Sequence, residues 1–148
     1  MTTEIKPADI EGAWQLQSWL IHYPEGREPG APFGSNPGGQ LLYSPDGWMS
    51  ATVHRDHRAA FPVGLSPRKL DHGLIAEAYW SYFHYAGKWR IEGDAVIHSV
   101  LHSLNPAMVG TEQVRYMTLE PARLILTGLE PVAEGERTHK LVWHRPDF

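Results

Sequence analysis

The sequence predicts a small all-β protein of eight short antiparallel strands, at most ten, with a single α-helix. Three observations predict it: 148 residues suit one domain, apolar and polar residues alternate along much of the chain, and turns rich in Pro and Gly separate the runs. Closing such a sheet removes its exposed edges, and an eight-stranded barrel has room for one small ligand. We therefore expect one barrel domain over residues 1–148, with residues 1–9 as an N-terminal extension.

Turn residues place the strands along the chain. The segment 23–39 is crowded with Pro and Gly and is expected to be a long loop after the first strand. Ser44-Pro45-Asp46-Gly47 fits a type I turn, which predicts a hairpin between strands at 40–43 and 48–53. The remaining strands are expected at 85–91, 95–104, 111–119, 123–127 and 137–145, with a Pro/Gly/Glu loop before the last of them.

One helix is expected between the third and fourth strands. Residues 54–65 form a polar segment punctuated by proline, and Ser66-Pro67 then supplies an N-cap and a first-turn proline. Apolar residues follow at helical spacing, at Leu70, Leu74 and Ile75. The pattern predicts a helix over residues 67–81.

Composition argues against several classes of function. The formal net charge is -4 and no basic stripe is present, which argues against nucleic acid and anionic membranes as partners. No run of 18 apolar residues and no signal-peptide pattern occurs, so we expect a cytoplasmic protein. The absence of cysteine excludes disulfides and thiolate chemistry, and no nucleotide-binding or serine-hydrolase motif appears. We expect no cofactor and no metal.

Four segments resemble a known family. They are Gly12-Ala13-Trp14, the hairpin region 33–51, the segment 109–115 and the segment 141–145. Together they are similar to the bacterial and fungal lipocalin-like domain family, small β-barrels built around a ligand cavity. The resemblance implies that Trp14 and Arg145 form a structural cation-π pair at the closed end of the barrel. It also implies roles in secondary metabolism or aromatic catabolism.

Two histidines are the first candidates for acid/base chemistry. His98 and His102 share one face of a predicted strand but stand about 13 Å apart, too far to ligate one metal together. Inside a barrel, one of them could lie beside Gln113 or Arg115 of the next strand as an acid, a base or a hydrogen-bond partner. The alternative is that both face solvent or satisfy hydrogen bonds in the core.

Gln113 and Arg115 alternate onto the same face of their strand. If that face is internal, Arg115 needs Glu112, another carboxylate or an anionic ligand group beside it, because an isolated buried charge is costly. If the face is external, Arg115 is an ordinary surface cation. An internal pair would suit a carboxylate, an enolate or a carbonyl oxygen.

The middle of the chain is rich in aromatic residues, which suit either a pocket for flat molecules or a core. Hydropathy leaves open which face of the strand 48–53 points inward, and in a ligand barrel the polar set can be the internal one. The candidate ligand-binding residues are Trp48, Ser50, His54, Tyr85, Trp89 and Gln113, and the candidate catalytic residues are His98, His102, Arg115 and Tyr43.

Three functions remain open at this point. The first is a cofactor-independent lyase, isomerase, cyclase or dehydratase acting on a hydrophobic, aromatic or polyketide-like molecule. In it, His98 or His102 acts as acid and base, with Tyr43 or Tyr85 as the proton partner. The second is a carrier or sensor of a hydrophobic molecule, and the third is a structural barrel with a filled interior. The sequence also allows the protein to form a homodimer.

Overall fold

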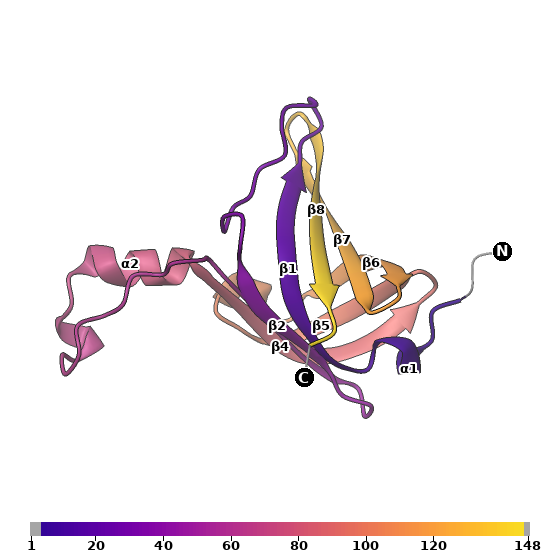
Figure 1. Ribbon diagram of the computed structural model, residues 1–148, viewed down its shortest axis with the longest axis horizontal. Coiled ribbons are helices and arrows are strands. Elements are labelled where there is room, and N and C mark those ends of the chain that lie inside the picture. The colour runs from indigo at the N-terminus through magenta and orange to yellow at the C-terminus, as the bar shows by residue number, and fades with distance from the viewer. Residues whose placement is uncertain (1–3, 147–148) are drawn as a thin grey trace.

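Eight antiparallel strands close into one barrel in the computed structural model, which describes residues 4–146 (Figure 1). The strands are β1 (Gly12–His22), β2 (Gly38–Tyr43), β3 (Trp48–His54), β4 (Tyr82–Glu92), β5 (Ala95–Ser103), β6 (Glu112–Glu120), β7 (Arg123–Val132) and β8 (Gly135–His144). Each strand pairs with the next one in the chain, and β8 pairs with β1 to close the sheet. The expected all-β barrel is confirmed.

The hairpin of β2 and β3 forms as its turn residues predict. The N–H of Gly47 donates to the carbonyl oxygen of Ser44 at 3.1 Å, which closes the four-residue turn. Gly47 has a φ of 96°, a backbone conformation that other residues rarely adopt. The turn sets the register in which Tyr43 lies opposite Met49.

The helical segments differ from the prediction. Ser66 caps only the short 3-10 helix η1 (Pro67–Lys69), and the α-helix α2 (His72–Trp80) begins after Asp71. The predicted helix over 67–81 is therefore two segments, because the backbone at Leu70 is extended. The structure adds the short helix α1 (Pro7–Ile10), which begins within the expected N-terminal extension and ends one residue beyond it, and the 3-10 helix η2 (Pro106–Met108).

The last hairpin is longer than expected. The sequence places a loop after residue 127, whereas β7 continues to Val132 and β8 starts at Gly135. Gly128 and Pro131 look like breakers in the sequence, yet both pair with residues of β8. The predicted Pro/Gly/Glu loop is wrong, and these residues instead extend the wall of the barrel.

One end of the barrel is closed by α1 and a cation-π pair. Ile10 is fully buried, and its carbonyl oxygen accepts a hydrogen bond from Trp14 Nε1 at 2.9 Å. The Arg145 guanidinium lies 3.7 Å from the centre of the Trp14 ring and donates to the carbonyl oxygen of Ala13. The structural role that the resemblance implied for Trp14 and Arg145 is confirmed.

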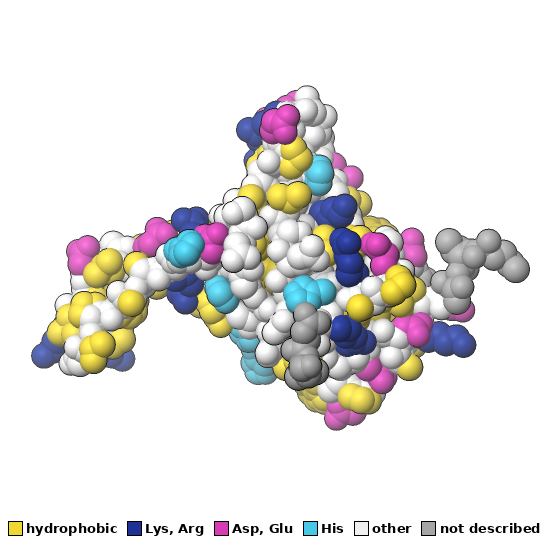
Figure 2. All heavy atoms as spheres, viewed as in Figure 1, with side chains coloured by type: hydrophobic (Ala, Val, Ile, Leu, Met, Phe, Trp, Pro, Cys, Tyr) yellow, Lys and Arg dark blue, Asp and Glu magenta, His cyan; other side chains and the backbone are white. Residues whose placement is uncertain are grey.

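Residues 55–81, which we call the arm, project from the barrel between β3 and β4 (Figure 1). Hydrophobic side chains gather on its surface (Figure 2), and those exposed are Phe61, Val63, Leu65, Leu74, Ile75 and Trp80. Neither α2 nor any other helix within residues 4–146 has the length and apolar character needed to cross a membrane.

Candidate functional site

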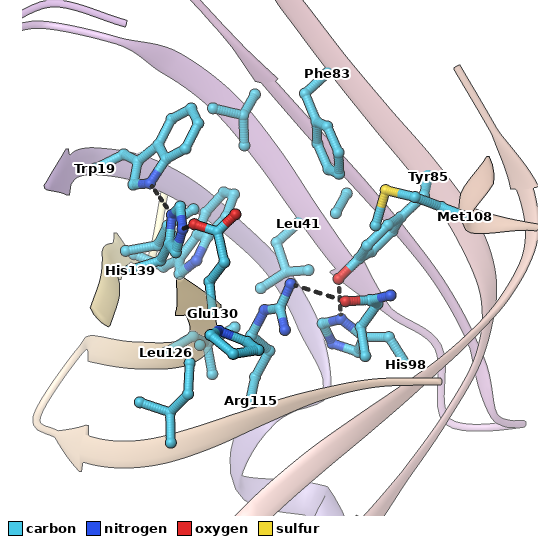
Figure 3. Close-up of a pocket in the computed structure, with 18 residues that line it drawn as sticks. Trp19, Leu41, Phe83, Tyr85, His98, Met108, Arg115, Leu126, Glu130 and His139 are labelled. Atoms are coloured by element: carbon cyan, nitrogen blue, oxygen red, sulfur yellow. Dashed lines mark hydrogen bonds and ion pairs between the residues drawn. The ribbon is translucent and has the colours of Figure 1, made fainter. Parts of the chain in front are cut away.

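The barrel contains a cavity of about 340 Å³. Its wall is mostly apolar, and polar groups stand at two places on it (Figure 3). The lining residues are Trp19, Leu41, Ala51, Val53, Phe83, Tyr85, His98, Met108, Gln113, Arg115, Leu126, Gly128, Leu129, Glu130, Pro131, His139, Leu141 and Trp143. The barrel is therefore not filled, which contradicts the third function that the sequence left open.

His98 lies between two tyrosines in the deepest polar group. Its side chain is 2 % exposed, with Nε2 at 2.6 Å from the Tyr43 hydroxyl and Nδ1 at 2.6 Å from the Tyr85 hydroxyl. The three residues come from different strands, β5, β2 and β4. Tyr85 and His98 line the cavity, whereas Tyr43 lies behind them in the core and packs against Trp89.

Burial keeps all three groups uncharged. Burial, together with the nearby positive charge of Arg115, lowers the pKa of His98 from 6.5 to about 3. Burial also raises the pKa of both tyrosines, although Arg115 opposes this rise. At neutral pH, the site therefore offers a neutral imidazole and two neutral phenols.

Arg115 brings a positive charge to the cavity wall. Its guanidinium donates to the carbonyl oxygen of Val114 at 2.9 Å and lies 3.5 Å from Oε1 of Gln113. Gln113 in turn donates to Thr111 Oγ1 at 2.8 Å, which fixes the orientation of its amide. Glu112, which the sequence offered as a partner for Arg115, instead pairs with Arg90 at 2.8 Å on the outer face.

A second polar group stands at the rim of the cavity. Trp19 Nε1 donates to His139 Nδ1 at 3.2 Å, so the proton of a neutral His139 is on Nε2, which donates to Glu130 Oε1 at 3.0 Å. Glu130 also lies 3.8 Å from Arg137. Its carboxylate therefore has two partners at the rim.

A β-bulge separates the two histidines that were expected to share a face. In the pairing of β4 with β5, Ala86 lies opposite His102 but Gly87 lies opposite Val100, so Leu101 is an extra residue. The bulge turns His102 to the exposed outer face while His98 stays inside. A Cβ atom at Gly87 would collide with the carbonyl oxygen of Ser99. The prediction of His102 as a cavity residue is wrong.

Several predicted ligand-binding residues also lie outside the cavity. On β3 the apolar residues face inward, so Trp48, Ser50 and His54 point away from the interior. Trp48 is 48 % exposed and lies against Lys88. Trp89 is buried in the core, where its Nε1 donates to the carbonyl oxygen of Ser44. Of the six candidates, the structure places Tyr85 and Gln113 on the cavity wall.

Sequence reasoning missed the rim residues and the glycine beside Arg115. Strand alternation contains a signal for them, because Trp143, Leu141 and His139 are spaced by two along β8 and all line the cavity. The same spacing in β7 connects Leu126, Gly128 and Glu130.

The described part of the chain holds no group of three His, Asp or Glu side chains arranged to bind a metal ion. His54 lies near His57 on the outer face, but its Nδ1 bonds to the carbonyl oxygen of Arg55. The polar groups of the cavity carry hydrogen-bond donors and acceptors, which can bind and polarise an organic ligand.

The comparisons agree with the observed fold. The family model described as a lipocalin-like domain matches residues 11–146, which is nearly the whole chain. Neither the curated proteins nor the solved structures contain a match. A closed eight-stranded barrel with a largely apolar cavity is suited to small hydrophobic molecules. Because the match spans the barrel from its first strand to its last, the chain belongs to the lipocalin-like domain family.

Proposed function

We propose that this protein binds a small hydrophobic molecule, aromatic or polyketide-like in character, inside its barrel. One observation carries the proposal: a mostly apolar cavity has the Tyr85 hydroxyl and the Arg115 guanidinium on its wall. Apolar walls supply the affinity in such sites, and a few placed polar groups orient the ligand. A cavity of about 340 Å³ suits a molecule of two or three fused or linked rings.

A neutral fluorescent probe tests binding in the cavity. Phenylnaphthylamine, which brightens in apolar surroundings, is titrated into the protein and into Ala51→Phe. Ala51 lies on the cavity wall, so a phenylalanine there occupies the space that the probe needs. We expect the variant to bind the probe about tenfold more weakly or worse, since a lost apolar contact area of this size costs over 1 kcal/mol.

Ser50→Phe is the matched control, because Ser50 precedes Ala51 on β3 and points to the outer face. It adds the same ring without entering the cavity and should leave the affinity within about twofold. Equal losses in both variants would contradict a binding site inside the barrel.

A second candidate function is acid/base catalysis on an enolisable carbonyl compound. It is favoured by the hydrogen-bonded row of Tyr43, His98 and Tyr85, which ends at the cavity. In this reaction the carbon-hydrogen bond next to the carbonyl breaks and the Glu130 carboxylate accepts the proton. The electron pair moves to the carbonyl oxygen, where Tyr85 and Arg115 stabilise the negative charge. Return of the proton to the other face of this carbon, or to a different carbon of a conjugated enolate, completes an isomerisation.

Proton exchange with solvent measures this catalysis directly. β-Tetralone, a hydrophobic aromatic ketone, is incubated with the protein in deuterium oxide, and loss of its α-proton signal is followed by NMR. We expect exchange about 10² times faster than in buffer, and a return toward the buffer rate in Tyr85→Phe. If the unaltered protein exchanges the α-proton no faster than buffer does, the catalytic proposal is wrong and ligand binding alone is supported.

A further inference from the structure

We propose that the ligand of the barrel is a hydrophobic acid bound as its anion, with its acidic oxygens against the Arg115 guanidinium and the Tyr85 hydroxyl. This inference rests on the proposed function, because it names the chemical class of the molecule that the cavity receives. Three features of the cavity wall support it. They are the charge of Arg115, the packing of its guanidinium against Gly128, and the direction of the hydroxyl proton of Tyr85.

Arg115 has no carboxylate partner among residues 4–146. Its hydrogen bonds go to a carbonyl oxygen and an amide oxygen, which are both neutral. Glu112, its neighbour in sequence, is paired with Arg90, and Glu130 on the cavity wall is paired with Arg137 and His139. Arg115 is half-buried on a mostly apolar wall, and an anionic ligand would supply the counter-ion that its guanidinium lacks there.

Gly128 holds the guanidinium against the barrel wall. It lies on β7, next to β6, and a Cβ atom there would stand 3.2 Å from the Cζ, Nε and Nη1 atoms of Arg115. The missing side chain therefore makes room for the flat face of the guanidinium on the strand. No positive φ is required at Gly128, so close approach is the reason for a glycine at this position.

Counting protons sets the direction of the hydrogen bonds around His98. The two phenols and the neutral imidazole carry three protons, and the two bonds between them use two. The third proton is therefore the hydroxyl proton of either Tyr43 or Tyr85, and it points away from His98. Tyr43 is 1 % exposed, lies outside the cavity and has no other acceptor within the described residues, so its proton goes to His98 Nε2.

The remaining bond then follows. His98 carries its proton on Nδ1 and donates it to the Tyr85 oxygen, and the Tyr85 proton is free to point into the cavity. Figure 3 shows Tyr85, His98 and Arg115 converging on one part of the cavity. The wall thus presents donors and a positive charge, which match a carboxylate or a phenolate.

Two probes of equal shape test the inference. Naphthoate and naphthamide share the same rings, but at pH 7 only naphthoate is charged, because carboxyl groups ionise near about pH 4. We expect naphthoate to bind about tenfold or more tightly than naphthamide, measured by calorimetry. In Arg115→Met this preference should disappear, while the affinity for naphthamide stays within about twofold.

Arg90→Met is the control for overall charge, since Arg90 is exposed on the outer face and its removal changes the net charge equally. It should keep the preference for naphthoate. Equal binding of both probes, or an equal loss of preference in Arg90→Met, overturns the anion inference while phenylnaphthylamine binding still supports the proposed function. If none of the three probes binds, the proposed function fails and the inference fails with it.

The proton direction has its own test. Long-range nitrogen-proton NMR correlations distinguish the two neutral forms of an imidazole, and we expect His98 to be protonated on Nδ1 at pH 7. If His98 is instead protonated on Nε2, it donates to Tyr43, and the Tyr85 hydroxyl donates to Nδ1. That result would overturn the role of Tyr85 as a donor to the ligand.

Discussion

Replacing His98 with alanine is expected to lower the free energy of unfolding by about 3 to 5 kcal/mol. The imidazole is the partner of two buried hydroxyl groups, those of Tyr43 and Tyr85. Its removal leaves both without a hydrogen bond in surroundings that water reaches poorly, and it also enlarges the cavity. Urea unfolding followed by tryptophan fluorescence measures the loss.

The same substitution at His102 supplies the control. His102 lies on the same strand but is exposed beyond the bulge, so His102→Ala should change the free energy of unfolding by less than about 0.5 kcal/mol. Comparable losses for the two alanine variants would show that the row of Tyr43, His98 and Tyr85 does not form.

Acidification is expected to destabilise the protein through the same histidine. The pKa of His98 is about 3 in the folded protein and about 6.5 in the unfolded chain, so between these values the unfolded chain binds the extra proton. The stabilisation is complete above pH 6.5 and decreases as the pH falls. Between pH 7 and pH 4 this one group should remove about 3 kcal/mol from the free energy of unfolding.

Comparison with His98→Gln isolates this contribution from that of the acidic residues. Glutamine retains one acceptor and donors at the site but does not titrate, so the variant should lose about 3 kcal/mol less than the unaltered protein over the same pH range. Tyr43, Tyr85 and Arg115 are the ionisable groups that face His98, and burial raises the pKa of both tyrosines, so neither phenol ionises between pH 4 and pH 7. Parallel pH curves would contradict the low pKa of His98.

The parts of the fold that local chemistry determines could be read from the sequence. The turn from Ser44 to Gly47 fixes its hairpin through a proline and a glycine, both of which act within four residues. The pairing of Arg145 with Trp14 followed from the family resemblance. These features depend on few residues, so a short motif is sufficient to specify them.

The orientation of the strands was harder to predict, because it depends on contacts between strands. A period of two predicts one face for His98 and His102 only when no residue is inserted, and the extra Leu101 breaks that rule. Gly87 on the partner strand accommodates the bulge, and nothing adjacent in sequence links Gly87 to Leu101. On β3, an apolar set and a polar set fit the strand equally well until the wall of the cavity is known.

The polar residues of the site were predicted only in part for a similar reason. His98, Gln113 and Arg115 were candidates because they are polar residues on predicted strands, and Tyr85 because it belongs to the aromatic middle of the chain. Gly128 did not stand out, since its role is to leave space for Arg115 on a strand that the sequence predicted to be shorter. Space left by a missing side chain has no sequence signature apart from a glycine, and glycine occurs in proteins for many other reasons.

The arm leaves and rejoins the sheet at a single point. His54 and Tyr82 lie opposite each other as the last pair of β3 and β4, and the N–H of Arg55 donates to the carbonyl oxygen of Ser81 just beyond them. The segment between these residues is consequently a site for insertion or replacement. A short turn or an unrelated peptide in its place leaves every strand pair of the barrel unchanged.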